Sequence, residues 1–354
     1  MLPKNLSYKG KIESAACRSY KANIAPQNGT GPYSLGDTVI INIPTRNNLC
    51  MSTLDSYLKF TLPSITSGAA DSGFRWGPGG ANGLISRIRV WSGSNLLEDI
   101  TEYGLLASMM NDLQVSTDSF YGKNTILQGT RNDLVVTFPT HTTYTSADNV
   151  AANIKAGVDG CFASLDGALV GCNQINSGAA LADSAAPYGA ILASGKTTTE
   201  NTYCLNLISI LGSLCSAQYF PLFACKSSAI RLEITLVSSL VNAGAVLGTL
   251  TTPNGVMKNV EFVCQMLELS DSAMGTISQS LQGQPLQFVV PTYKNLPYTT
   301  NSMTNGTTNS VSFAIACKVS SLKSIFITQR DKGAGGNSLF SAFNNYRRNY
   351  RLQF

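Results

Sequence analysis

Short runs in which apolar and polar residues alternate recur along this chain, and they constrain its fold more than any other feature of the sequence. In Thr38–Ile43 every second residue is a valine or an isoleucine, and Ser56–Leu62 alternates in the same way. A period of two is typical of β-strands with one buried face. Residues 84–100 form a predicted hairpin that turns at Ser92-Gly93-Ser94. Further strands are predicted at Thr202–Ile208, Ala229–Val237, Val260–Met266, Leu286–Tyr293, Ser310–Val319 and Leu322–Gln329.

Two short helices interrupt these strands. The first is predicted at about residues 100–113, with Asp99 as its N-cap and Glu102 three residues later. The second follows Ser270 or Asp271, either of which can cap it. Their apolar faces, which we expect to pack against the core or another subunit, are Leu105, Leu106, Met109, Met110 and Leu113 in the first helix and Met274, Ile277 and Leu281 in the second.

The composition supports an all-β chain. Only 13% of the 354 residues are charged, while 44% are hydrophobic and 31 are glycine. This balance argues against coiled coils, helical bundles and chains kept disordered by charge. A surface with few charges also repels its own copies weakly, so the composition favours self-assembly.

The cysteine and histidine content argues against a metal site. Nine cysteines occur without a Cys-x-x-Cys pair, and the chain has one histidine. The first residues lack the apolar stretch of a signal peptide, and we expect reduced cysteines in a reducing compartment. No metal and no cofactor is expected.

The excess positive charge lies at the two ends of the chain. These basic residues could contact nucleic-acid phosphates or lipid headgroups, or they could be solvated ends without a ligand. The candidates for such contacts are Lys4, Lys9, Lys11, Arg18 and Lys21 at the N-terminal end and Arg347, Arg348 and Arg351 at the C-terminal end.

No catalytic residue is predicted, and we expect that the protein is not an enzyme. His141 is the one candidate base, and no nucleophile motif accompanies it. The acids Glu98, Asp99 and Glu102 are explained by the helix start beside them.

The order of the segments predicts three regions. Residues 1–36 are an expected N-terminal arm, residues 37–250 a first β-sandwich with a long exposed loop at 141–200, and residues 251–354 a second β-sandwich. Each sandwich is expected to contain strands, then a short helix, then more strands.

Five segments together resemble the double-jelly-roll major capsid proteins of tailless icosahedral DNA viruses, including the Polinton-like and virophage-related lineages. The ordered set carries the resemblance, since no single piece is a sharp motif. The segments are SYLKFTL at 56–62, ISRIRVWSGSNLLEDITEYGLLASMMNDL at 85–113, YFPLFACKSSAIRLEITLV at 219–237, NVEFVCQMLEL at 259–269 and SVSFAIACKVSSLKSIFITQRD at 310–331.

The resemblance implies two tandem eight-stranded antiparallel jelly rolls, with the second opening at NVEFVCQMLEL. The chain reaches Phe354 before the strands that would complete that second barrel, so either the protein is a short member of the family or the sequence is incomplete. Three chains would form a pseudo-hexameric capsomer of an icosahedral virion shell.

The resemblance also implies the partners of such a subunit. These are neighbouring capsomers, penton and minor capsid proteins, an internal membrane or the genome at the basic ends, and a host receptor at the 141–200 loop. The alternative reading is a secreted or surface β-sandwich adhesin or lectin-like protein, which would carry disulfides.

Overall fold

A computed structural model gives the architecture of the chain. It describes residues 17–67, 72–76, 79–116, 119, 124–129, 191–192, 200–215, 219–225, 228–247, 250–281, 284, 286, 288–298, 314–315 and 321–327.

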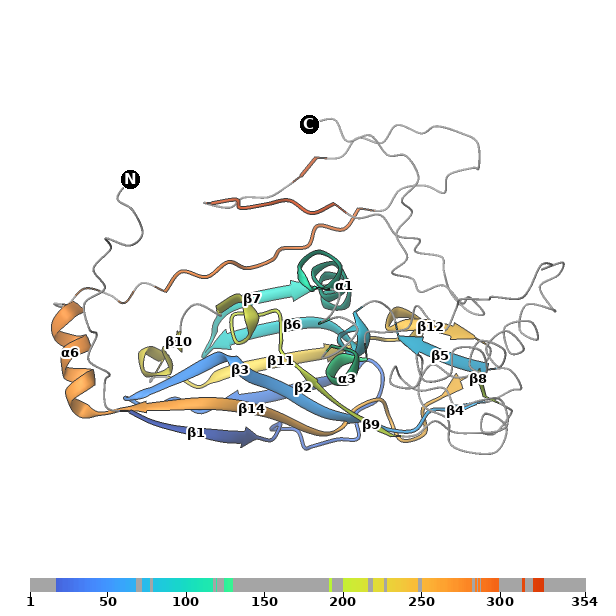
Figure 1. Ribbon diagram of the computed structural model, residues 1–354, viewed down its shortest axis with the longest axis horizontal. Coiled ribbons are helices and arrows are strands. Elements are labelled where there is room, and N and C mark those ends of the chain that lie inside the picture. The colour runs from blue at the N-terminus through green and yellow to red at the C-terminus, as the bar shows by residue number, and fades with distance from the viewer. Residues whose placement is uncertain are drawn as a thin grey trace.

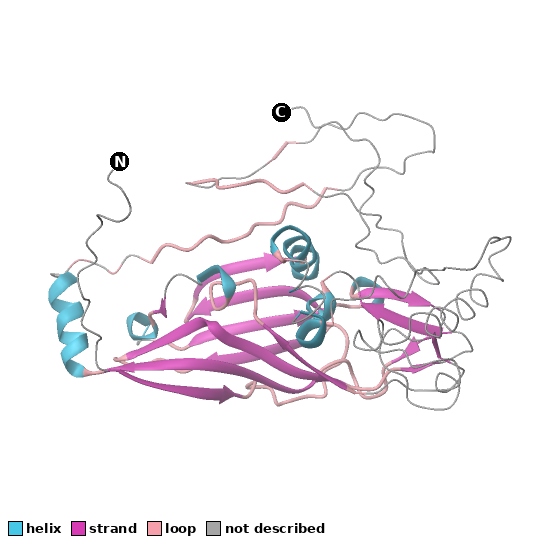
Figure 2. Cartoon of the chain, viewed as in Figure 1, coloured by secondary structure: helices cyan, strands magenta, loops and turns pink. Residues whose placement is uncertain are grey.

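A five-stranded and a four-stranded antiparallel sheet form the body of the molecule (Figures 1 and 2). The first sheet has the order β1-β14-β3-β10, and β9 also pairs with β3. The second has the order β2-β11-β6-β7. Their bounds are β1 (Cys17–Ile24), β2 (Thr38–Ile43), β3 (Leu49–Leu62), β6 (Ile85–Ser92), β7 (Asn95–Thr101), β9 (Asn201–Leu205), β10 (Tyr219–Phe220), β11 (Ile230–Leu236) and β14 (Lys258–Leu269).

The strand order of these sheets is that of a jelly roll. β9 and β10 pair with successive parts of β3, so together they occupy one strand position. With the eight positions numbered along the chain, the sheets read 1-8-3-6 and 2-7-4-5. Two interlocked Greek keys in facing sheets define the jelly-roll sandwich. The all-β expectation is confirmed, and the described strands complete one jelly roll.

The alternating residues of the sequence fill the space between the two sheets. Val39, Ile41 and Ile43 of β2 are fully buried, as are Phe60 of β3 and Phe262 of β14. Burying each such side chain stabilises the fold by about 1.5–3 kcal/mol. The core therefore follows directly from the period of two.

The domain boundary expected at residue 250 differs from the observed strand pairing. β14 lies between β1 and β3, with Cys17 opposite Leu269 and Lys59 opposite Glu261. The segment expected to open a second barrel is therefore the last strand of the first. Alternation predicts a strand but not its partner, which here lies about 200 residues earlier in the chain. A second jelly roll within 251–354 stays a prediction, because most residues after 298 lie outside the described ones.

The expected N-terminal arm also differs from the structure. Residues 17–24 form β1, and Tyr20, Ala22 and Ile24 pack against the core. Tyr33, also within the expected arm, is buried and pairs with Met257. The apolar alternation of Tyr20, Ala22 and Ile24 was the signal for this strand, and the lysine and arginine beside them obscured it.

Smaller elements surround the sandwich. The expected loop at 141–200 lies outside the described residues except at 191–192 and 200. The small strands and helices are β4 (Thr66–Ser67), β5 (Ser72–Trp76), β8 (Ile191–Leu192), β12 (Gly244–Leu247), β13 (Leu250–Thr251), η2 (Gly80–Leu84), η5 (Ser213–Cys215), η6 (Leu222–Cys225), η7 (Leu240–Asn242) and α3 (Thr125–Gln128).

Both predicted helices are present with changed details. α1 (Tyr103–Gln114) buries Tyr103, Ala107 and Met110, whereas Leu113 is 62% exposed. Glu102 precedes α1 in a left-handed conformation, and no side-chain hydrogen bond caps the helix.

The second predicted helix is α6 (Asp271–Leu281), which has no fully buried residue. The Ser270 hydroxyl accepts a hydrogen bond from the Ala273 N–H, which confirms Ser270 as the cap.

The strands expected near the C-terminal end are not found where they can be checked. Residues 288–298 and 321–327 are described, and neither stretch belongs to a strand. Alternation is present in Leu286–Tyr293, but the described residues 288–293 show none of the backbone pairing that a strand requires.

Candidate functional site

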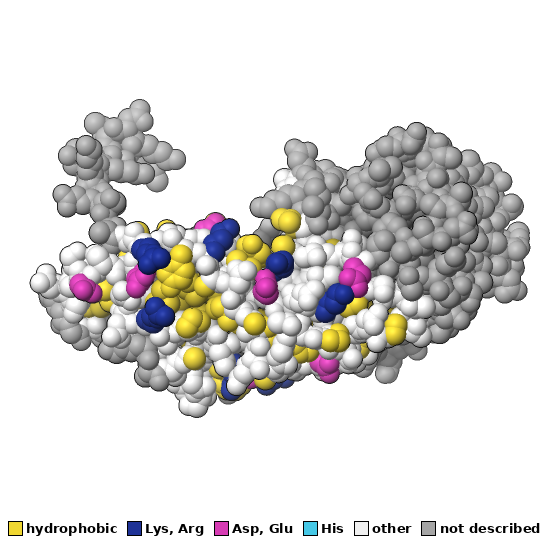
Figure 3. Space-filling view, turned by 90° about the horizontal axis from the view of Figure 1, so that it is seen from below, with side chains coloured by type: hydrophobic (Ala, Val, Ile, Leu, Met, Phe, Trp, Pro, Cys, Tyr) yellow, Lys and Arg dark blue, Asp and Glu magenta, His cyan; other side chains and the backbone are white. Residues whose placement is uncertain are grey.

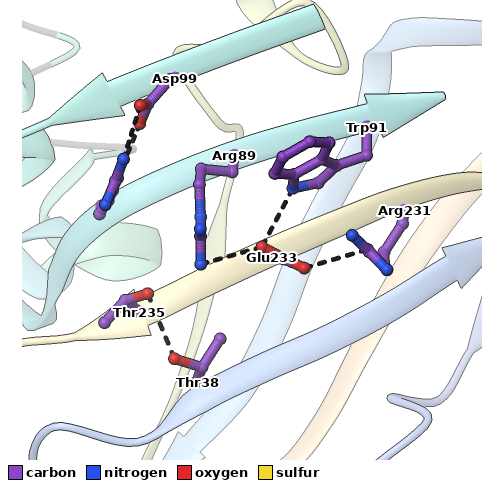
Figure 4. Close-up of polar contacts among 8 residues, drawn as sticks. Thr38, Arg89, Trp91, Asp99, Arg231, Glu233 and Thr235 are labelled. Carbon is purple, nitrogen blue, oxygen red and sulfur yellow. Dashed lines mark hydrogen bonds and ion pairs between the residues drawn. The ribbon is translucent and has the colours of Figure 1, made fainter. Parts of the chain in front are cut away.

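A row of ion pairs crosses the outer face of the second sheet. On β11, Arg231, Glu233 and Thr235 point outward while Leu232 and Ile234 point into the core. The strand register places Glu233 opposite Arg89 of β6. Figure 4 shows Glu233 between both arginines, with Arg89 Nη2 at 3.0 Å and Arg231 Nε at 3.0 Å.

Glu233 is enclosed although it lies on an outer face. Its side chain is 10% exposed, and its carboxylate also accepts a hydrogen bond from Trp91 Nε1 at 3.1 Å. The Arg231 guanidinium lies 5.4 Å from the centre of the Trp91 ring. The aromatic ring and the arginine stems thus shield the charges from water, which strengthens their attraction.

A second ion pair extends this row onto β7. Arg87 donates to Asp99 through two hydrogen bonds, of 2.7 and 2.6 Å. These bonds lower the pKa of Asp99. Asp99 was expected to cap α1, and that expectation is wrong, because the register turns its side chain toward Arg87 on the outer face.

A one-residue bulge in β7 directs Glu98 into the interior. The register between β6 and β7 shifts at Leu97, so Glu98 lies opposite the buried Val90. Leu97 is 44% exposed, and Glu98 is 2% exposed. Without the bulge these two residues would exchange faces. The buried position of Glu98 depends on the strand register, so the sequence pattern alone does not predict it.

Glu98 joins three separate parts of the chain. One carboxylate oxygen accepts hydrogen bonds from the Ser209 hydroxyl at 2.5 Å and the Ile210 N–H at 3.0 Å. The other accepts from the Thr292 hydroxyl at 3.2 Å. Burial raises the pKa of Glu98, and the three donors oppose that rise.

A cavity of about 300 Å³ separates β7 from the segment around Thr292. It is lined by residues 97–99, 101 and 292–295. Its two carboxylates are engaged, Asp99 with Arg87 and Glu98 with its three donors. The arrangement therefore positions chain segments, because Glu98 ties β7 to the turn at Ser209 and to Thr292.

A bulge in β3 presents an apolar side chain to solvent. Ser52 pairs with Gln265 and Tyr57 with Val263, so four residues of β3 oppose one residue of β14. The Asn206 side chain donates to carbonyl oxygens of the bulge, at 2.8 Å for Leu54. Leu54 is 57% exposed, and these bonds fix the backbone that carries it.

Two of the predicted interaction residues can be placed. Arg18 and Lys21 are exposed on the edge strand β1, and the Arg18 guanidinium lies 6.0 Å from the centre of the Tyr20 ring. His141 and the remaining basic candidates lie outside the described residues, so their roles stay predictions. The residues not placed are Lys4, Lys9, Lys11, Arg347, Arg348 and Arg351.

The face of the molecule shown in Figure 3 carries few charges. In Figure 3, lysine and arginine side chains occur singly or beside acidic ones, separated by uncharged and hydrophobic side chains. In the described ranges, no group of histidine, cysteine and acidic residues could hold a metal ion. None of the helices that the structure describes has the length and apolar character needed to cross a membrane.

Comparisons with known proteins identify similar solved structures only. No protein-family model matches the sequence, and no curated protein matches it. The Faustovirus major capsid protein is 12% identical, with 79% of this chain and 59% of that chain covered and a TM-score of 0.40. The structure of PBCV-1 VP54 fitted into the virophage Sputnik is 11% identical, covering 77% and 47%, with a TM-score of 0.37.

A third similar structure is that of the mavirus major capsid protein. It is 12% identical, with 76% of this chain and 51% of that chain covered and a TM-score of 0.32. This chain thus spans about half the length of the structures it matches.

Proposed function

We propose that this protein is a structural subunit of a viral capsid shell. The observation that carries the proposal is the strand order 1-8-3-6 and 2-7-4-5, which makes the strands from β1 to β14 a jelly roll. Jelly rolls build many viral capsid and lectin domains. The capsid reading is favoured because the five resembling segments occur in the same order and the chain has few charges.

Assembly is the proposed mechanism. Three copies form a pseudo-hexameric capsomer, and capsomers abut through large interfaces of apolar and uncharged polar groups. Such contacts form only where copies repel each other weakly. The low fraction of charged residues, 13%, meets this condition. A second jelly roll after residue 281 is part of this proposal.

The remaining partners follow from the same proposal. Neighbouring capsomers, penton proteins and minor capsid proteins contact the sides of the subunit, and the 141–200 loop faces a host receptor. The basic ends, including Arg18 and Lys21, face the genome or an internal membrane. The subunit folds in a reducing compartment of the host cell and is then part of the virion.

Light scattering of the purified chain over a range of concentrations tests this function. A mass three times that of one chain, growing to larger species at high concentration, is the expected result. A strictly monomeric protein at high concentration would contradict the proposal.

Thiol titration distinguishes the lectin-like alternative, which shares the jelly-roll scaffold. Nine reactive thiols in the denatured, unreduced protein are expected for a capsid subunit made in a reducing compartment. Four disulfides and one thiol would instead favour the secreted binding protein.

A further inference from the structure

An extended segment, Phe288–Tyr298, runs along the open side of the sandwich. β7 is the end strand of the second sheet and β10 is the end strand of the first. In Figure 1 the segment passes beside β7 on its way from α6 toward α1. Its contacts bridge the two sheets: Phe288 meets Phe220 of β10 edge to face at 5.4 Å, and Thr292 donates to Glu98 of β7 at 3.2 Å.

Side-chain contacts hold this segment against the sandwich. Phe288 and Val290 pack against the core, whereas Val289 between them is 77% exposed. The Tyr293 hydroxyl lies 3.5 Å from the Met110 sulfur of α1. Within the described ranges no backbone hydrogen bond joins the segment to β7. A segment held in this way can detach without breaking a sheet, because no ladder of hydrogen bonds has to open.

The edge that lies beside this segment needs protection. An end strand presents unpaired N–H and C=O groups, which invite pairing with another chain. Natural sheets protect such edges with charges, bulges or a covering segment, and β7 carries the bulge at Leu97 and the inward Glu98. The segment adds a cover to this edge, where Thr292 contacts Glu98 of β7.

We propose that Phe288–Tyr298 is a detachable strap that shields the free edge of β7. The buried Glu98 anchors the strap by accepting the hydrogen bond from Thr292. Glu98 suits this role because two of its three donors belong to the fixed turn at Ser209 and Ile210. The Glu98 carboxylate is therefore already oriented before the strap binds. Binding of the strap then orders only the strap itself. This inference does not depend on the capsid proposal.

Hydrogen exchange followed by mass spectrometry on the full chain tests the strap. Two variants release it: Thr292→Val removes the polar contact at nearly constant volume, and Phe288→Ala removes the aromatic contact. Val289→Ser is the matched control, because that side chain points to solvent. Peptides from β7 and from 288–298 report on the strap, and a peptide from β11 reports on global unfolding.

The expected result is exchange about tenfold faster in β7 and in 288–298 for each releasing variant, as loss of one anchoring contact implies. The control variant and the β11 peptide should stay at wild-type rates. Unchanged β7 exchange in both releasing variants would overturn the proposal. It would also be overturned if β11 exchange rose as much as β7 exchange, since the segment would then open only with the whole sandwich.

Discussion

Replacing Glu233 by alanine is expected to destabilise the sandwich more than any other removal of a surface charge. The substitution removes the shared partner of Arg89 and Arg231, and it leaves the Trp91 N–H without its acceptor. Both guanidinium groups would then remain partly enclosed on the sheet face without the carboxylate that they share.

The magnitude follows from how exposed these groups are. Removing one partner of a fully buried ion pair costs about 3–5 kcal/mol. The side chains of Arg89 and Arg231 are 30% and 41% exposed, so water compensates part of the loss. We therefore expect a decrease of about 2–3 kcal/mol in the free energy of unfolding. For a chain of this size the midpoint temperature should fall by about 3–4 °C.

Urea unfolding monitored by tryptophan fluorescence measures this loss, with Glu261→Ala as the matched control. Glu261 occupies β14 of the other sheet and pairs with Lys59 at 3.3 Å, with side chains 33% and 43% exposed. Its removal should cost less than about 1 kcal/mol. Equal losses for Glu233→Ala and Glu261→Ala would refute the reasoning, because enclosure of the charge would then have no effect.

Three further predictions concern other sites. Gly212→Ala should severely destabilise the protein in thermal unfolding, since the added carbon would lie 1.9 Å from a backbone oxygen. In contrast, the carbon added by Gly275→Ala in α6 meets nothing within 4 Å, so this substitution should stabilise the protein by about 0.5–1 kcal/mol. Burial raises the pKa of Glu98 above 4.5, so the folded chain binds its proton more tightly than the unfolded chain and the ionised form costs stability. Glu98→Gln should therefore stabilise the protein at pH 7 and lose this advantage as the pH falls toward 4.5, which urea unfolding at several pH values checks. Burial raises the pKa of Cys50 to about 11, so mass spectrometry after brief alkylation at pH 8 should find Cys50 unmodified and the exposed Cys17 modified.

The sequence predicted the strands correctly where alternation is regular, so that the buried face and the exposed face of the strand can be told apart. The predicted bounds of β2 are the observed ones, and β11 and the β6–β7 hairpin lie within one residue of expectation. In β2 and β11 the apolar residues recur at every second position, and the sandwich buries these residues. Local pattern and tertiary structure agree there, so the pattern was sufficient.

Pairing partners and register could not be read from the sequence. β14 was predicted as a strand but assigned to a second sandwich, because its neighbours β1 and β3 are distant in the chain. Glu98 was interpreted as part of a helix start, although a single bulge at Leu97 places it inside. Phe288–Tyr293 has the alternation of a strand, yet side chains rather than backbone bonds attach it. Each of these depends on contacts between residues far apart in sequence, which a local period does not encode.

Cryo-electron microscopy of the purified full chain at high concentration tests the central claim most directly. The claim is that a charge-poor jelly-roll sandwich assembles into capsomers of a viral shell. We predict particles with threefold symmetry in which each copy contributes the described sandwich to a contact between copies. Images that contain only separate single chains, with no threefold particles at any concentration, would contradict the account.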